Sequence, residues 1–159
     1  MKILITLILA IICFDLTYAQ PIATTFEDAE SQGISIEILE STYKNAAHYE
    51  PQKGVFKERQ TEFLSEYRNL HITLGQYLSD HGFEWPETTK LFTRVYFDSS
   101  GTIDYFLINP GKANLSENET EKYFSLLNEF IQNYQLPISA DIGFAQCSPV
   151  KYVANKEEK

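Results

Sequence analysis

The chain has 159 residues, with 22 acidic and 13 basic side chains, and its formal net charge at pH 7 is −9. Its basic residues are scattered singly along the sequence, whereas neutralising phosphate groups requires clustered lysines and arginines. We therefore expect no nucleic-acid partner and no attraction to anionic membrane surfaces. The acidity itself indicates solubility, and the length suits one domain with a sizeable core.

Residues 1–19 are predicted to be a secretory signal peptide. A lysine provides the positive end, residues 3–14 form an apolar run, and Thr17 and Ala19 place small side chains near a cleavage point before Gln20. The run is shorter than the roughly 20 apolar residues that span a bilayer, so we expect no integral membrane span. The mature protein is expected in the periplasm or outside the cell.

The stretch from residue 20 to residue 86 is predicted to be helical. A short helix covers 24–32, and a second begins after Ser35, a residue type that caps helix N-termini. A loop then leads to a long helix over roughly 55–81, along which apolar residues recur at helical spacing. Gly82 ends this helix, because glycine tolerates the left-handed conformation that follows many helices.

A β-hairpin follows the helical part. Two runs rich in β-branched and aromatic residues, 91–97 and 102–108, flank a short polar turn. Gly101 closes the turn, because glycine adopts the positive φ that a tight reversal needs. Strand pairing here is therefore local in sequence.

Strict alternation assigns the side chains of the second hairpin strand to two faces. Ile103, Tyr105 and Leu107 would share one face, with Asp104, Phe106 and Ile108 on the other. Both faces of the hairpin carry aromatic residues, so we expect both to be at least half covered.

A helix and a last strand complete the chain. Ser116 and Glu119 have the spacing of a capping box, and an apolar stripe continues from Tyr123 towards residue 135. The last strand contains Pro149, which has no N–H to donate to a ladder. We expect this proline at a bulge or facing the outer side of the sheet.

These elements predict an α+β fold, with N-terminal helices followed by a small antiparallel sheet of three strands in β-β-α-β order. We expect residues 20–153 to form a single domain and residues 154–159 to form a disordered tail. A sheet of three strands has two edges, and an exposed edge is a ready site for adding a strand from a partner.

Asp80, His81 and Glu84 are the one polar grouping that suggests acid–base chemistry. A helix C-terminus followed by a polar turn produces the same grouping without function, and no pair of histidines has the spacing of metal ligands. Phosphate loops, nucleophile elbows and dinucleotide fingerprints are missing from the sequence. We therefore predict no catalytic residues, no metal site and no cofactor, and the binding residues stay unknown.

Cys147 is the one cysteine left after removal of the signal peptide, so we expect no intrachain disulfide. A lone thiol in an exported protein can be a nucleophile, a metal ligand or an intermolecular bridge. Reactive cysteines need an electropositive and accessible setting, which the neighbouring sequence does not supply. The favoured interpretation is a small side chain packed within the last strand.

The segment 92–152, with the hairpin VYFDSSGTIDYFLI, resembles the C-terminal domain of TonB-type energy transducers. The shared pattern is V-x-F-x-x-x-G-x-I, here Val95 to Ile103, followed by a helix and a closing strand. The resemblance implies an exported bacterial protein that uses this fold for binding. The chain departs from TonB proteins because its apolar segment is expected to be cleaved, and because it contains no proline-rich spacer.

The sequence therefore favours an exported, non-enzymatic binding protein that takes a protein or peptide partner by strand addition. Two alternatives stay open, namely a small periplasmic hydrolase or other enzyme, and a structural component of the envelope. A cleft that joins Cys147 or Asp80 to a histidine would favour the enzyme. A bare strand edge beside exposed aromatic residues would favour the binding protein.

Overall fold

The computed structural model describes residues 20–111 and 113–154. They form an α+β fold on one mixed, five-stranded sheet with the strand order β1-β4-β3-β5-β2. The expected signal peptide lies outside the described residues, and so does the expected tail apart from Ala154. Of the helices in this described part, none is both long and apolar enough to cross a membrane.

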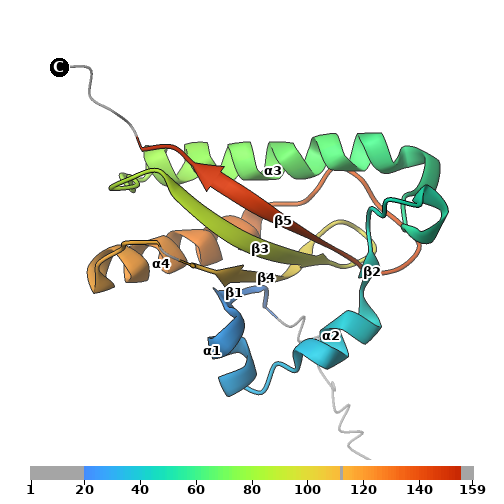
Figure 1. Ribbon diagram of the computed structural model, residues 1–159, viewed down its shortest axis with the longest axis horizontal. Coiled ribbons are helices and arrows are strands. Elements are labelled where there is room, and N and C mark those ends of the chain that lie inside the picture. Colours follow the sequence, from blue (N-terminus) through green and yellow to red (C-terminus); the bar gives the residue numbers. More distant parts are fainter. Residues whose placement is uncertain (1–19, 112, 155–159) are drawn as a thin grey trace, which may run out of the picture.

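Figure 1 shows the elements along the chain. Their bounds are β1 (Ile22–Thr25), α1 (Phe26–Ser31), α2 (Ile36–Thr42), β2 (Lys44–Asn45), the 3-10 turns Pro51–Lys53 and Lys57–Arg59, α3 (Gln60–Asp80), β3 (Thr89–Phe97), β4 (Ile103–Asn109), α4 (Glu117–Asn133) and β5 (Phe144–Tyr152).

The sheet is larger than the sequence predicts. The three expected strands are present, with β3 in the middle and antiparallel to both β4 and β5. Two short strands from the N-terminal part extend the sheet, β1 beside β4 and β2 beside β5, and both pair in parallel. The prediction of a wholly antiparallel sheet of three strands is therefore wrong in its strand number and in its outer pairings.

The first predicted helix begins later than expected, because Thr24 belongs to β1. Thr25 then caps α1, and its Oγ1 accepts a hydrogen bond from the N–H of Asp28 at 3.0 Å. The second helix is confirmed, with Ser35 as its N-cap.

The long helix is shorter at its start than predicted. Phe56 turns into the core and stacks on Phe63 at 4.7 Å between ring centroids. Lys57 has a φ of 40°, which interrupts helical geometry, so α3 begins only at Gln60. Its end is as predicted, because Gly82 has a φ of 70° and the next N–H bonds back to Leu78 O at 2.8 Å.

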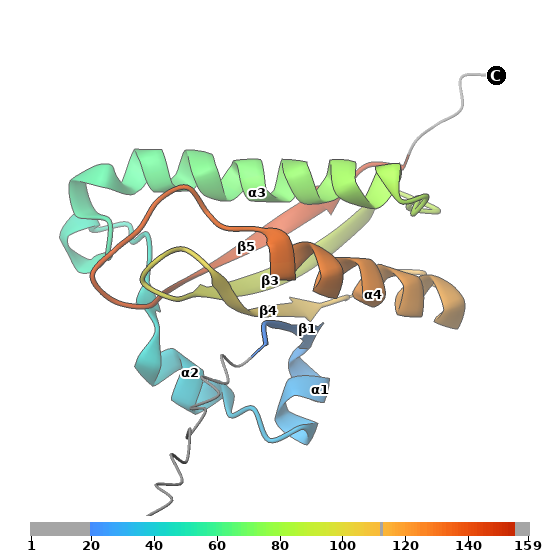
Figure 2. The ribbon, with the colours of Figure 1, turned by 180° about the vertical axis from the view of Figure 1, so that it is seen from behind.

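Helices cover both faces of the sheet. Figures 1 and 2 show α3 and α4 on one face and the shorter α1 and α2 on the other. The α3–α4 side holds the larger apolar cluster, which includes Phe97, Phe106 and Phe144. The α1–α2 side holds a smaller cluster that includes Tyr96 and Leu107. The expectation that both faces of the hairpin are covered is confirmed.

Two side chains of the hairpin, Ile103 and Asp104, lie on the opposite face from the predicted one. The carboxylate of Asp104 accepts a hydrogen bond from the Tyr43 hydroxyl at 2.7 Å, on the α1–α2 side. The register pairs Tyr96 with Tyr105 but Phe97 with Ile103, so Asp104 is the extra residue of a β-bulge. The bulge reverses the alternation and places Ile103 in the α3–α4 cluster, with Phe106 rather than with Tyr105. Strict alternation fails here because a bulge inserts one residue into only one strand.

The capping box of α4 is confirmed. Ser116 Oγ accepts a hydrogen bond from the N–H of Glu119, whose side chain accepts one from the N–H of Ser116 at 2.7 Å. The stripe that follows is buried as predicted. Its fully or nearly buried members are Tyr123, Leu127, Phe130 and Ile131.

Candidate binding groove

Most of the sheet's edges are covered. At the β1 edge, the side chain of Asn128 in α4 bonds to both the N–H and the O of Ala23, at 2.9 and 3.0 Å. At the β2 edge, the N–H groups of Val55 and Phe56 donate to Asn45 O and Ala46 O, at 3.0 and 3.2 Å. Both outermost strands are therefore closed by neighbouring segments of the chain.

One edge segment stays open. Strand β2 pairs with β5 only at Phe144 and Ala145, so the rest of β5 has no strand on its outer side among the described residues. An unpaired strand segment presents a row of backbone N–H and C=O groups for pairing. The open edge of β5 is therefore the place where the sheet can accept another strand.

Two hydrogen bonds determine which backbone groups of β5 face outwards. Gly143 O and Ala145 O accept from residues of the β2 segment, at 3.2 and 2.8 Å, so they point away from β3. Because strand geometry has a period of two, the backbone groups of Cys147, Pro149 and Lys151 point the same way.

The outward groups of β5 differ in their availability. The side chain of Gln146 donates to Cys147 O at 3.0 Å and so occupies that carbonyl. Pro149 offers its carbonyl but has no N–H to donate. Lys151 offers both an N–H and a C=O. Pro149 is in register with Phe92 without a bulge between β3 and β5, so the expected placement facing outwards is the one found.

Helix α3 forms the second wall of a groove along this edge. The groove has a volume of about 560 Å³ and lies between α3 and residues 148–153. Its helical side consists of Leu64, Tyr67, Arg68, His71, Ile72 and Gly75.

The rim of the groove is apolar and accessible. Leu64, Ile72 and Val153 are 40%, 52% and 65% exposed, respectively. Gly75 widens the groove, since a Cβ at this position would lie 3.7 Å from the ring of Tyr152, at ordinary van der Waals contact. An extended chain beside β5 would therefore meet backbone groups on one side and apolar side chains on the other.

His71 forms part of the groove wall. Its ring packs edge-on against Tyr67 and Phe106, at 4.9 and 6.0 Å between centroids, and neither ring nitrogen bonds to a described residue. Burial lowers the pKa of His71 to about 4, because it disfavours the charged imidazolium. The ring is therefore neutral at physiological pH.

The groove residues do not form a catalytic pair. Ser148 Oγ is buried, and neither it nor His71 hydrogen-bonds to a described residue, so this serine and histidine are not joined as a nucleophile and its base. The hydroxyl of Tyr67 donates to Gln146 O at 3.1 Å, and burial raises its pKa to about 12. This tyrosine holds α3 on the sheet.

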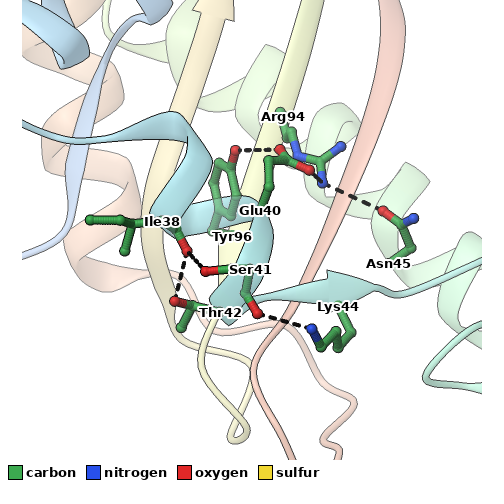
Figure 3. Close-up of polar contacts among 8 residues, drawn as sticks. All are labelled: Ile38, Glu40, Ser41, Thr42, Lys44, Asn45, Arg94 and Tyr96. Carbon is green, nitrogen blue, oxygen red and sulfur yellow. Dashed lines mark hydrogen bonds and ion pairs between the residues drawn. The ribbon is translucent and has the colours of Figure 1, made fainter.

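A second polar cluster lies on the opposite face of the sheet, against α2. Glu40 accepts hydrogen bonds from Arg94 at 2.6 Å and from the Tyr96 hydroxyl at 3.1 Å (Figure 3). Asn45 Oδ1 accepts from the same guanidinium nitrogen at 3.4 Å. Because both oxygens of Glu40 have donors and the side chain of Arg94 is largely buried, we assign the cluster a structural role. It holds α2 and β2 on β3.

The residues that suggested chemistry in the sequence are not brought together. His81 Nδ1 lies 2.7 Å from Tyr77 O, and no hydrogen bond among the described residues joins His81 to Asp80 or Glu84. Cys147 is opposite Arg94 in the register, on the α2 side of the sheet, whereas His71 lies on the α3 side. The described ranges contain no group of three or more His, Cys, Asp or Glu side chains placed to hold a metal ion.

The groove was not predicted as a site from the sequence. Its two walls are about 80 residues apart in the chain, and neither carries a recognisable motif. Two weak signals were present, namely Pro149 in the last strand and Gly75 inside the long helix, since an interior glycine often marks a close approach.

The chain matches no family model, and no characterised protein or solved structure is significantly similar to it. The resemblance of residues 92–152 to the TonB C-terminal domain therefore stays a prediction.

Proposed function

We propose that this protein is an exported, non-enzymatic binding protein, and that it takes an extended segment of a partner protein as an added strand on β5. The observation that carries this proposal is the open outer edge of β5 beyond Ala145, beside the groove formed by α3. Main-chain hydrogen bonds would supply affinity, and the groove side chains would supply selectivity.

The features of β5 that hinder pairing are compatible with this proposal. Proline and lysine on an edge strand reduce indiscriminate association, because one removes a donor and the other adds a charge. The carbonyl of Pro149 and both backbone groups of Lys151 remain free to pair. Such an edge would accept a selected strand and resist most others.

Two observations favour binding over the enzymatic alternative. The groove contains a neutral histidine and a serine that are not hydrogen-bonded to each other. The thiol of Cys147 and the ring of His71 belong to opposite faces of the sheet. The TonB-like order of elements in residues 92–152 agrees with a binding role.

Filling the groove tests the proposal. Gly75→Phe would place a ring in the groove between α3 and β5, with its Cβ 3.7 Å from the Tyr152 ring, at ordinary van der Waals contact and without conflict with backbone atoms. We expect this variant to lose capture of partner proteins from an envelope extract while it stays folded by circular dichroism. Thr73→Phe, at an exposed position of α3 outside the groove, is the matched control and should keep capture.

Export is part of the proposal and has its own test. The mature protein should begin near Gln20, because the apolar run is short and ends in small residues. Intact-mass measurement of the exported protein checks this. Retention of Met1 in a membrane fraction would contradict it.

A further inference from the structure

We infer that the segment bound at β5 is acidic, an inference that rests on the proposed strand addition. Arg68 lies on the α3 wall of the groove, and Lys151 lies on the β5 edge, where its side chain belongs to the α2 side of the sheet like that of Cys147. None of the described residues lining the groove is an aspartate or glutamate. The chain as a whole carries a net charge of −9, so an edge with a cation on each face and no carboxylate in the groove differs from the rest of the molecule.

The cations at the β5 edge have no counter-ions in the described structure. Among the described cations, Lys53, Arg59 and Arg94 form ion pairs with glutamates at 2.6, 3.0 and 2.6 Å, whereas the others do not. Arg68 and Lys151 form none within 4 Å among residues 20–111 and 113–154. Both side chains are exposed, so their charges are available to an incoming chain.

A third cation lies beside Lys151, on the α2 side of the sheet. The register places Lys90 of β3 directly opposite Lys151 of β5, and both are exposed. Like charges directly opposite each other on neighbouring strands are destabilising. A carboxylate on an added strand would relieve this repulsion, which gives an acidic segment an advantage over a neutral one.

The same charges argue against a second copy of this chain as the occupant. Symmetric antiparallel pairing of two β5 edges would bring Arg68, Lys90 and Lys151 of each copy towards the same three cations of the other. Such like-charge contacts across an interface oppose association. Charge complementarity therefore selects an acidic strand from a different protein.

Capped octapeptides that alternate threonine with glutamate, with glutamine or with lysine test this inference. Threonine favours the extended conformation, so the three peptides differ mainly in charge. We expect the glutamate peptide to bind about tenfold more tightly than the glutamine peptide at low salt, and the lysine peptide not to bind. Fluorescence anisotropy with an uncharged dye measures affinity, and amide exchange at Lys151 reports strand addition.

A charge-matched pair of variants locates the effect. Replacing Arg68 and Lys151 by glutamine should remove the preference for glutamate and its decline with salt. Replacing Lys44 and Lys57 by glutamine changes the net charge by the same amount at the other end of the sheet. This variant should keep the preference for the glutamate peptide and its decline with salt.

The outcomes separate this inference from the proposed function. Equal binding of the glutamate and glutamine peptides, with protection of the Lys151 amide, would overturn the acidic preference and keep strand addition. Absence of amide protection with every peptide would overturn both. A dimer of the free protein in light scattering would also overturn the inference, because the edge would then be occupied by a second copy.

Discussion

At the scale of single residues, His71 makes stability depend on pH. Its pKa is about 4 in the folded protein and near 6.5 in an unfolded chain, so between these values the unfolded state binds more protons. The free energy of unfolding should therefore fall as the pH is lowered from 7 to 5, by about 2 kcal/mol from this residue.

His71→Phe should remove that part of the pH dependence, because phenylalanine keeps an aromatic ring against Tyr67 and Phe106 but does not titrate. Urea unfolding at pH 7 and pH 5 measures the difference. His81→Phe, at an exposed position, is the control. Between pH 7 and pH 5, its free energy of unfolding should fall by as much as that of the natural protein. A natural protein equally stable at both pH values would show that His71 is not buried in its neutral form.

Gly101 gives a second prediction at this scale. Its φ is 91°, and an added Cβ would lie 2.6 Å from Leu136 O and 2.8 Å from Ile138 O, so the backbone itself would have to move. Gly33 has a similar φ of 83° but nothing within 4 Å of its Cβ position. Both alanine variants carry the left-handed strain, and only one carries the clash.

We expect Gly33→Ala to cost about 1 kcal/mol of unfolding free energy, and Gly101→Ala to cost about 2 kcal/mol more because of the overpacking. Chemical denaturation of both variants checks this. Equal costs would mean that the loop around Leu136 adapts freely and does not constrain the hairpin turn.

Prediction from sequence succeeded at residues whose role is set by near neighbours. Ser116, Gly82 and the positive φ of Gly101 depend on segments within a few residues, so spacing and residue type were sufficient, whereas the close approach of Leu136 to Gly101 was not predicted. His71 and Arg68 owe their surroundings to a strand about 80 residues later in the chain, and no local pattern contains that information.

At the scale of elements, the two added strands escaped prediction because they are four and two residues long. So short a run cannot show alternation, and its pairing depends on β4 and β5, which come much later in the sequence. The proposed site follows from this error. A sheet of three strands would leave both edges open, whereas β1 and β2 restrict the open edge to the outer part of β5.

The closure of the β1 edge by α4 is testable. The side chain of Asn128 accepts from the N–H of Ala23, donates to its carbonyl oxygen, and also donates to Phe124 O at 2.8 Å. Asn128→Ala should therefore leave buried backbone groups without partners and cost about 2 kcal/mol. Urea unfolding measures the cost, and hydrogen exchange at the Ala23 amide should accelerate.

Asn133→Ala in the same helix is the matched control. Its side chain donates only to Glu129 O at an exposed position, so stability should change little. If the Ala23 amide stayed protected in Asn128→Ala, another group would be closing the β1 edge.

At the scale of the whole molecule, the N-terminal and C-terminal halves are interleaved in one sheet. Strands β1 and β2 attach the α1–α2 layer to β4 and β5, and Glu40 adds an ion pair to Arg94 in β3. Removing this layer would expose Tyr96 and Leu107, which are fully buried. We therefore expect both layers to unfold together.

Two natural probes on opposite faces of the sheet can test this expectation. Trp85, the single tryptophan, is buried on the α3–α4 side and stacks on Tyr152 at 4.8 Å. Cys147 lies on the α2 side, opposite Arg94. Tryptophan fluorescence and the rate of thiol labelling, followed across a urea series, should yield the same midpoint and the same free energy of unfolding, as two-state unfolding requires. Thiol labelling that rises at lower urea than the fluorescence change would instead show that the α1–α2 layer opens as a separate unit of lower stability.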